Sequence, residues 1–163
     1  MSTGNAAGLS ARTSRDRDYP AIRQFTVFVE NRVGKLLEIL RRFEGSKVRI
    51  VALSITEATE GAIIRLMVSH PEQGRELLEL AGLQFIETDL LGVELPEGPQ
   101  PLARICMALL QVEVNIHQVY PFLVQPHGRS AVALQIDNIE MATDTLASKK
   151  FVIVHENDLK HDE

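Results

Sequence analysis

An internal repeat constrains the fold of this 163-residue chain more than any other feature. Residues 25–56 align without gaps on residues 91–122 at an offset of 66, and after the next turn the offset becomes 68. The change indicates a two-residue insertion in one hairpin of the second copy. A repeat of this length means that one supersecondary unit occurs twice, so we expect two related halves.

The apolar positions of the two copies predict the same helix in each. Both copies contain an apolar stripe with the i, i+3, i+4, i+7 spacing that is typical of a helix with one buried face. The stripe consists of Leu36, Ile39, Leu40 and Phe43 in the first copy and of Leu102, Ile105, Cys106 and Leu109 in the second. Alternating apolar residues at 64–68 and 132–136 predict a strand in each copy.

A second helix is predicted in each copy from its start signal. Ser69 and Asp137 occupy the same position of the repeat, and each is followed three residues later by a glutamate. This spacing is typical of a helix N-cap with a capping box, so we expect both residues to cap a helix. In the first copy Pro71 fits the first helical turn, and Gly82 is placed to end the helix near Ala81.

These signals predict six elements per copy, in the order strand, helix, strand, strand, helix, strand. In the first copy they span residues 23–30, 33–44, 48–57, 62–69, 71–81 and 83–89, and the last strand of the second copy spans 151–156. This βαββαβ order places both helices on one face of an antiparallel sheet and leaves the other face bare. We therefore predict an α+β protein of two ferredoxin-like repeats that pair as a pseudo-dimer and so bury more surface.

The predicted units are a tail and two repeats. The stretch before residue 20 is rich in small and polar residues, which have too little apolar surface to offset the entropy of ordering. We expect a disordered tail over residues 1–22, a first repeat over 23–89 and a second repeat over 90–159.

Composition excludes several classes of protein. The chain has 17 Lys and Arg against 22 Asp and Glu, a net charge of −5, so it lacks the basic surface that nucleic-acid binding needs. Its apolar runs fall far short of the roughly 20 residues that cross a bilayer, and the single Cys106 cannot form an internal disulfide. We therefore expect a cytoplasmic protein without a membrane or nucleic-acid partner.

The ionisable residues form no recognisable catalytic or metal motif. The five histidines lack metal-ligand spacing, and no serine lies in a nucleophile motif such as G-x-S-x-G. The sequence also contains no glycine-rich phosphate loop. We therefore expect no metal, no cofactor and no catalytic residue.

The turn between the first strand and the first helix is the best candidate for binding. It contains Asn31, Arg32, Val33, Gly34 and Lys35. Asn31 is a good N-cap, and Gly34 has no Cβ that would keep a ligand from the backbone. Free N–H groups at a helix start attract carboxylates. The alternative is that Asn31 and Gly34 only cap and pack the helix.

A ferredoxin-like repeat with N-x-x-G-x-L at this turn resembles the ACT domain, a small-molecule-sensing module of amino-acid metabolism. The family turn is usually D/N-x-P-G-x-L, and the first copy keeps Asn31, Gly34 and Leu36. The second copy keeps an acid, a proline and the leucine, but Gln100 replaces the glycine. The resemblance extends over about residues 23–159.

The resemblance also implies where a ligand binds. In amino-acid-binding ACT pairs the ligand lies between two modules, held by the turn of one and by the start of the second strand of the other, often through an asparagine. That strand position is Arg49 in the first copy and Asn115 in the second. We therefore expect one composite site built from Asn31, Gly34 and Asn115, because both positions have changed in the mirror-image site.

At the composite site, a ligand carboxylate would face the backbone N–H groups of residues 33–35. The side chains of Asn31 and Asn115 would meet the ligand ammonium. His117, two residues further along the second strand, would face the side chain of the ligand.

These expectations combine in a non-catalytic regulatory protein that binds a small molecule, in first place an amino acid, between its repeats. We expect a homodimer or larger homo-oligomer, and a metabolic enzyme is a further candidate partner. One alternative is a regulatory subunit of an amino-acid biosynthetic enzyme such as acetolactate synthase, whose small subunit also begins with a strand and a VEN-like turn. Others are an assembly module without a ligand and an acylphosphatase-like hydrolase in which Arg32 grips phosphate.

Overall fold

The computed structural model of the protein describes residues 20–30 and 33–160. Its first half contains β1 (Ile22–Val29), α2 (Lys35–Arg41), β2 (Ile50–Ala58), β3 (Gly61–Val68), α3 (Pro71–Leu80) and β4 (Gln84–Glu94). Its second half contains α4 (Pro101–Leu110), β5 (Ile116–Pro121), η2 (Pro126–Gly128), β6 (Ala131–Ile136), α5 (Ile139–Ser148), β7 (Ile153–Val154) and η3 (Glu156–Lys160). The α+β class and the repeated order of elements are confirmed.

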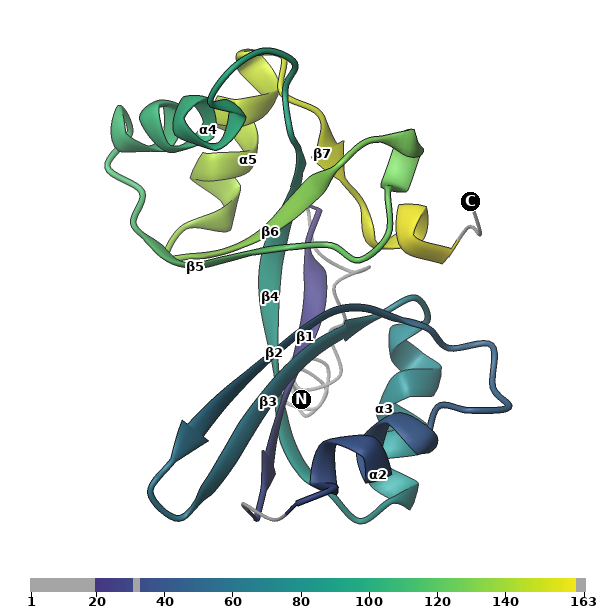
Figure 1. Cartoon of the computed structure of the whole chain (residues 1–163). Helices are drawn as coiled ribbons and strands as arrows, with labels where there is room; N and C mark the ends of the chain where they lie inside the picture. The colour runs from purple at the N-terminus through teal and green to yellow at the C-terminus, as the bar shows by residue number, and fades with distance from the viewer. Residues whose placement is uncertain (1–19, 31–32, 161–163) are drawn as a thin grey trace, which may run out of the picture.

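The strand β4 belongs to both halves of the molecule. Residues 84–90 pair with β1, while residues 91–94 pair with β6, and Gly92 and Val93 pair with β7 on the opposite edge. The sheet has the order β2-β3-β1-β4-β6-β5, and every pairing is antiparallel. Figure 1 shows β4 running through both modules. The predicted boundary between residues 89 and 90 falls inside β4, where this strand changes partners.

Each module has a core between its helices and its part of the sheet. α2 and α3 pack on the first module around Phe25 and Leu78, and α4 and α5 pack on the second around Ile105 and Leu146. All four side chains are fully buried. Each module therefore has the helices-on-one-face arrangement of a ferredoxin-like unit, as the repeat predicts.

A third core joins the faces that carry no helices. This seam core consists of Ile22, Val51, Ala52, Met67, Leu90, Phe122, Ala131, Ala133, Val154 and Leu159. The sheet curls around it until its two edges meet, because the N–H of Leu123, just after β5, donates to the carbonyl of Val51 in β2 at 2.7 Å. Pairing of the repeats thus buries the face that a lone module would leave bare.

The predicted N-caps Ser69 and Asp137 are wrong by one residue. The N-caps of α3 and α5 are His70 and Asn138, and the Asn138 side chain accepts the N–H three residues further on. Ser69 instead accepts the backbone N–H of Arg49 at 2.8 Å. This hydroxyl is therefore bonded to the residue that leads into the neighbouring strand, an alternative to capping that suits short polar side chains.

The ends of the chain also differ from the prediction. The last strand, predicted over residues 151–156, is reduced to β7, because Glu156 opens η3 and its carboxylate binds the Arg23 guanidinium at 3.1 Å. Ala21 and Ile22 are buried, so the fold begins before residue 23. Residues 1–19 of the predicted tail lie outside the described residues.

Candidate functional site

The predicted binding turn leads directly into α2. The N-cap of α2 is Gly34 at φ 85°, a left-handed conformation that favours glycine. Apart from Gly34 itself and its two chain neighbours, no atom of the described residues lies within 4 Å of the place a Cβ would occupy. Val33 is fully exposed, and Nζ of Lys35 pairs with a glutamate one turn further on at 3.5 Å. Asn31 and Arg32 fall outside the described residues. The prediction that Asn31 caps α2 is wrong, because Gly34 holds that position.

Asn115 precedes β5, and part of its amide is already hydrogen-bonded. The backbone N–H of Asn115 donates to Oδ1 of Asp137, and the side-chain Nδ2 of Asn115 donates to Oδ2 of Asp137, both at 3.1 Å. Ser69 and Arg49 make the equivalent backbone contact in the first module, so this pairing serves the fold of both repeats. One amide N–H of Asn115 is therefore committed, and its amide oxygen is the group left for a ligand ammonium.

The described residues of the predicted site do not come together within one chain. His117 is exposed on β5, and Figure 1 shows α2 at the far end of the first module from β5, which lies in the second. Residues 33–35 therefore cannot reach Asn115 or His117 of the same chain. The role of these residues in binding stays a prediction, and a composite site requires a second copy of the chain.

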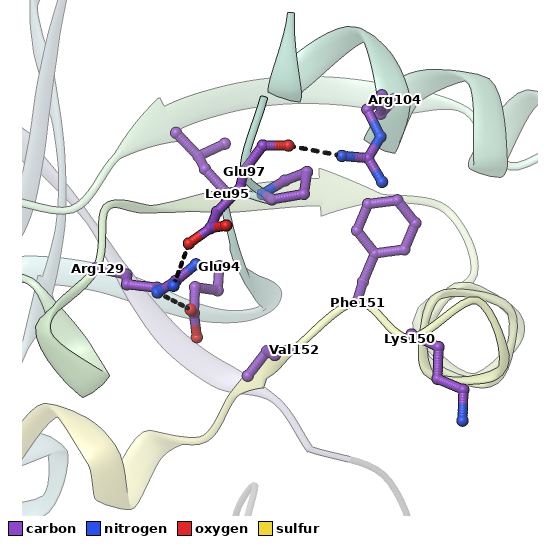
Figure 2. Close-up of a pocket in the computed structure, with 9 residues that line it drawn as sticks. Glu94, Leu95, Glu97, Arg104, Arg129, Lys150, Phe151 and Val152 are labelled. Carbon is purple, nitrogen blue, oxygen red and sulfur yellow. Dashed lines mark hydrogen bonds and ion pairs between the residues drawn. The ribbon is translucent and has the colours of Figure 1, made fainter. Parts of the chain in front are cut away.

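A pocket of about 400 Å³ opens at the equivalent turn of the second module (Figure 2). Its walls are the end of β4 and the turn from β4 to α4, the first half of α4, the loop between η2 and β6, and the segment between α5 and β7. Its lining residues are Glu94, Leu95, Pro96, Glu97, Arg104, Arg129, Lys150, Phe151 and Val152. We call it the turn pocket. Its mixture of three cations, two carboxylates and apolar side chains suits a small charged molecule.

Arg129 pairs with both carboxylates of the turn pocket. Its guanidinium binds the Glu97 carboxylate, and its Nε lies 3.5 Å from Oε1 of Glu94. The Glu97 side chain is 77% exposed, whereas that of Glu94 is only 10% exposed. Because exposed ion pairs contribute at most about 1 kcal/mol, the Arg129–Glu97 pair can open for a ligand. Glu94 is a fixed part of the wall.

His127 holds the other oxygen of Glu94 from behind the pocket. Its Nδ1 lies 3.3 Å from Oε2 of Glu94, and its Nε2 lies 3.1 Å from Oδ2 of Asp158 in η3. Burial lowers the pKa of His127, but hydrogen bonds and attraction from the two carboxylates outweigh burial, so the pKa is raised. Two carboxylates on two ring nitrogens fit the imidazolium form, which has two donors.

Arg104 is a cation of the pocket that no carboxylate of the described residues balances. Its guanidinium lies 5.8 Å from the centre of the Phe151 ring and donates to the Glu97 carbonyl at 2.9 Å. Within residues 20–30 and 33–160, neither Arg104 nor Lys150 forms an ion pair with a carboxylate. Figure 2 shows Arg104 over Phe151, while Lys150 lies at the rim and points away from the other side chains.

The first module has none of these cations at the equivalent positions. By the offsets of the repeat, Arg104, Arg129 and Lys150 correspond to Glu38, Gly61 and Gly82. The backbone of Lys150 is left-handed at φ 70°, as is that of Gly82 at φ 71°. The sequence prediction missed this pocket because it considered binding only at the turn before the first helix and at the start of the second strand of each copy. The signal that could have found the pocket is a difference between the copies: the second copy has basic residues at repeat positions where the first has glutamate or glycine.

The described residues contain neither a metal-binding cluster nor a helix that could span a membrane. No group of three or more His, Cys, Asp or Glu side chains in this part of the chain is placed to hold a metal ion. None of the helices described here is long and apolar enough to cross a membrane.

The architecture defines a tandem pair of ferredoxin-like modules that share one strand and carry a charged pocket at a strand-to-helix turn. A family model described as an ACT domain pair matches residues 20–162, which is nearly the whole chain. The chain belongs to this family of ACT domain pairs. No curated protein sequence matches it significantly.

Solved structures with the same architecture support this assignment of the fold. Protein BT0572 from Bacteroides thetaiotaomicron matches with a TM-score of 0.79 at 25% identity, over 90% of this chain and 100% of that one. The regulatory subunit of aspartate kinase from Thermus thermophilus, in a ligand-free form, matches with a TM-score of 0.55 at 12% identity, over 80% and 93%. A structure of aspartokinase alpha and beta subunits matches with a TM-score of 0.52 at 17% identity, over 77% and 90%.

Proposed function

We propose that the protein is a non-catalytic regulatory protein that binds a small molecule, in first place an amino acid, at the turn pocket of its second module. The observation that carries this proposal is the exposed pair of Arg129 and Glu97 at the pocket mouth. An amino-acid head group has one carboxylate and one ammonium, so it can replace this pair charge for charge. The membership in the ACT domain pair family supports a regulatory role, and we place that role in the cytoplasm.

The composite site is a second candidate, and it depends on a homodimer. The left-handed Gly34 leaves open space beside the start of α2, and the exposed Asn115 and His117 lie in the other module. A second copy that placed its β5 beside this turn would unite residues 31–35 with Asn115 and His117. We propose this arrangement as the site of the dimer, separate from the turn pocket.

Calorimetric titration of the full chain with each standard amino acid tests the two sites against each other. If the turn pocket binds, Arg129→Gln abolishes the heat of binding, while Asn31→Ala and Asn115→Ala leave the affinity unchanged. Arg41→Gln, on the exposed side of α2, is the matched control for the loss of one arginine. Binding that survives Arg129→Gln but disappears in either asparagine variant would move the site to the dimer interface. The absence of binding by any amino acid would contradict the proposal and favour an assembly module.

The remaining alternatives predict different partners or an activity. A regulatory subunit, of an enzyme such as acetolactate synthase or another amino-acid biosynthetic enzyme, would co-purify with a large catalytic chain and change its response to the amino acid. An acylphosphatase-like enzyme would hydrolyse acetyl phosphate and lose this activity in Arg32→Ala. Such a loss would overturn the assignment as a non-catalytic protein.

A further inference from the structure

We infer that the turn pocket selects ligands with net negative charge, so that an acidic amino acid binds in preference to its amide. This inference rests on the proposed function and adds the charge class of the ligand. It follows from the balance of charges in the pocket, from the shape of its apolar part and from the contrast between the two modules.

After a head group binds, two cations of the pocket lining, Arg104 and Lys150, still have no carboxylate partner within the described part of the chain, and Lys150 lies at the rim and points away (Figure 2). The ligand carboxylate can take the place of Glu97 on Arg129, and the ligand ammonium can take the place of Arg129 on Glu97. This exchange conserves charge, because two ion pairs with the ligand replace the one between Arg129 and Glu97, and the head group adds one positive and one negative charge. Arg104 is outside the exchange, and its contacts are the Glu97 carbonyl and the Phe151 ring. Its guanidinium is therefore free to bind a second carboxylate of the ligand, and such charge-assisted pairs are stronger than neutral hydrogen bonds.

The apolar part of the pocket fits a short carbon chain between the two charged ends. Phe151 lies between Arg104 on one side and Val152 on the other, and Arg129 with the two glutamates lies across from them (Figure 2). The volume of about 400 Å³ accommodates a molecule of amino-acid size. A ligand that spans Arg129 and Arg104 would therefore place its methylene groups beside the Phe151 ring.

A comparison of the two modules shows whether the fold itself requires the positive charge of the turn pocket. Both modules keep the left-handed residue before the first helix and the left-handed residue after the second helix. The first module has Gly34 and Gly82 there, whereas the second has Gln100 and Lys150, which are strained in this conformation. The fold itself therefore does not require a lysine at the rim. The basic residues are specific to the pocket of the second module, and Lys150 adds positive potential at its entrance.

The test compares acids with amides of the same size. Titration calorimetry of the full chain measures the affinities of L-glutamate, L-glutamine, L-aspartate and L-asparagine at one ionic strength. We expect at least one acid to bind about tenfold more tightly than its amide, the ratio that one charge-assisted pair supplies. In Arg104→Gln this preference disappears, because the acid loses its charge-assisted pair. Lys149 adjoins Lys150 but lies outside the pocket lining, so Lys149→Gln is the control and keeps the preference.

The outcomes separate this inference from the proposed function. Equal affinities for an acid and its amide, with both lost in Arg129→Gln, would overturn the charge selection and leave the amino-acid site in place. A preference that persists in Arg104→Gln would also overturn it. If none of the four probes binds and other amino acids also fail, the proposed function falls as well. Thermal unfolding of Arg104→Gln checks that this variant is folded, which is expected because Arg104 is exposed on α4.

Discussion

Left-handed residues at the helix starts show how the two copies of the repeat have diverged. Gly34 and Gln100 both precede their helices with positive φ, at 85° and 55°. A residue with a Cβ is strained in this conformation by about 1 kcal/mol or more. Beyond its two chain neighbours, no atom of the described residues would contact a Cβ at Gly34, so the backbone conformation is what opposes a substitution there.

We therefore expect Gly34→Ala to lower the free energy of unfolding by about 1 kcal/mol. Gln100→Gly should have the opposite effect and raise it by up to about 1 kcal/mol, because glycine relieves the strain. Urea denaturation of both variants measures these differences. Changes of opposite sign in the two variants support the left-handed conformation at both positions. A Gly34→Ala variant with unchanged stability would contradict it.

The charge of His127 links the turn pocket to pH. The groups that face its ring are Glu94 from β4 and Asp158 from η3, and Arg129 pairs with the same glutamate. The pKa of His127 is raised above its ordinary value of 6.5. The stabilisation from its charge is therefore complete below pH 6.5 and disappears as the pH rises through the folded pKa.

We expect the unfolding midpoint to fall as the pH rises through this range, and the fall to be smaller in His127→Gln. The affinity for L-glutamate should weaken over the same range, because neutral His127 no longer balances Glu94. A pH titration of the His127 ring signals by NMR, combined with calorimetry, tests both effects. A folded-state pKa below 6.5 would contradict the predicted direction.

At the scale of the elements, a buried ion pair joins β1 of the first module to η3 of the second. The Arg23 side chain is 4% exposed and the Glu156 side chain 9% exposed, with Nη2 and Oε1 3.1 Å apart. Glu72 of α3 also contacts Arg23, at 2.9 Å. Removal of the Arg23 guanidinium takes this ion pair from the buried Glu156 carboxylate, and breaking a buried ion pair on one side is strongly destabilising.

We expect Arg23→Met to lower the free energy of unfolding by about 3 kcal/mol. Arg75→Met is the matched control, because Arg75 pairs with Glu72 and Glu87 but is more exposed, at 28%. The free energy of unfolding of Arg75→Met should fall by about 1 kcal/mol or less. Chemical denaturation of the two variants gives the comparison, and similar losses in both would show that burial of Arg23 does not matter.

The elements themselves could be predicted from the sequence, but their connections and the pocket could not. Apolar periodicity located the helices because Ile39 and Ile105 recur in the same buried stripe. Residues 83–94 read as the end of one strand and the start of another, and no local pattern shows that they form one strand shared by both modules. Arg104, Arg129 and Lys150 are far apart in the chain, so only the fold brings them to one pocket.

At the scale of the whole molecule, η3 connects the turn pocket to the seam between the modules. Asp158 in η3 binds His127, which holds Glu94 in the pocket wall. Two residues earlier, Glu156 accepts the backbone N–H of Arg23 in β1 at 3.1 Å, and Leu159 is buried in the seam core. A change of charge in the pocket can therefore alter the contacts that hold the modules together.

This connection predicts that ligand binding strengthens the seam. An anionic ligand on Arg129 and Arg104 reduces the positive charge that competes with His127 for Glu94, so the contacts of His127 with Glu94 and Asp158 should tighten and hold η3 in place. Hydrogen exchange with saturating L-glutamate should then show slower exchange of the Arg23 amide, which donates to Glu156. Asp158→Asn should still bind L-glutamate but lose this added protection, because a neutral amide attracts the imidazolium less strongly. Protection that is equal in the two proteins would show that the pocket and the seam respond independently.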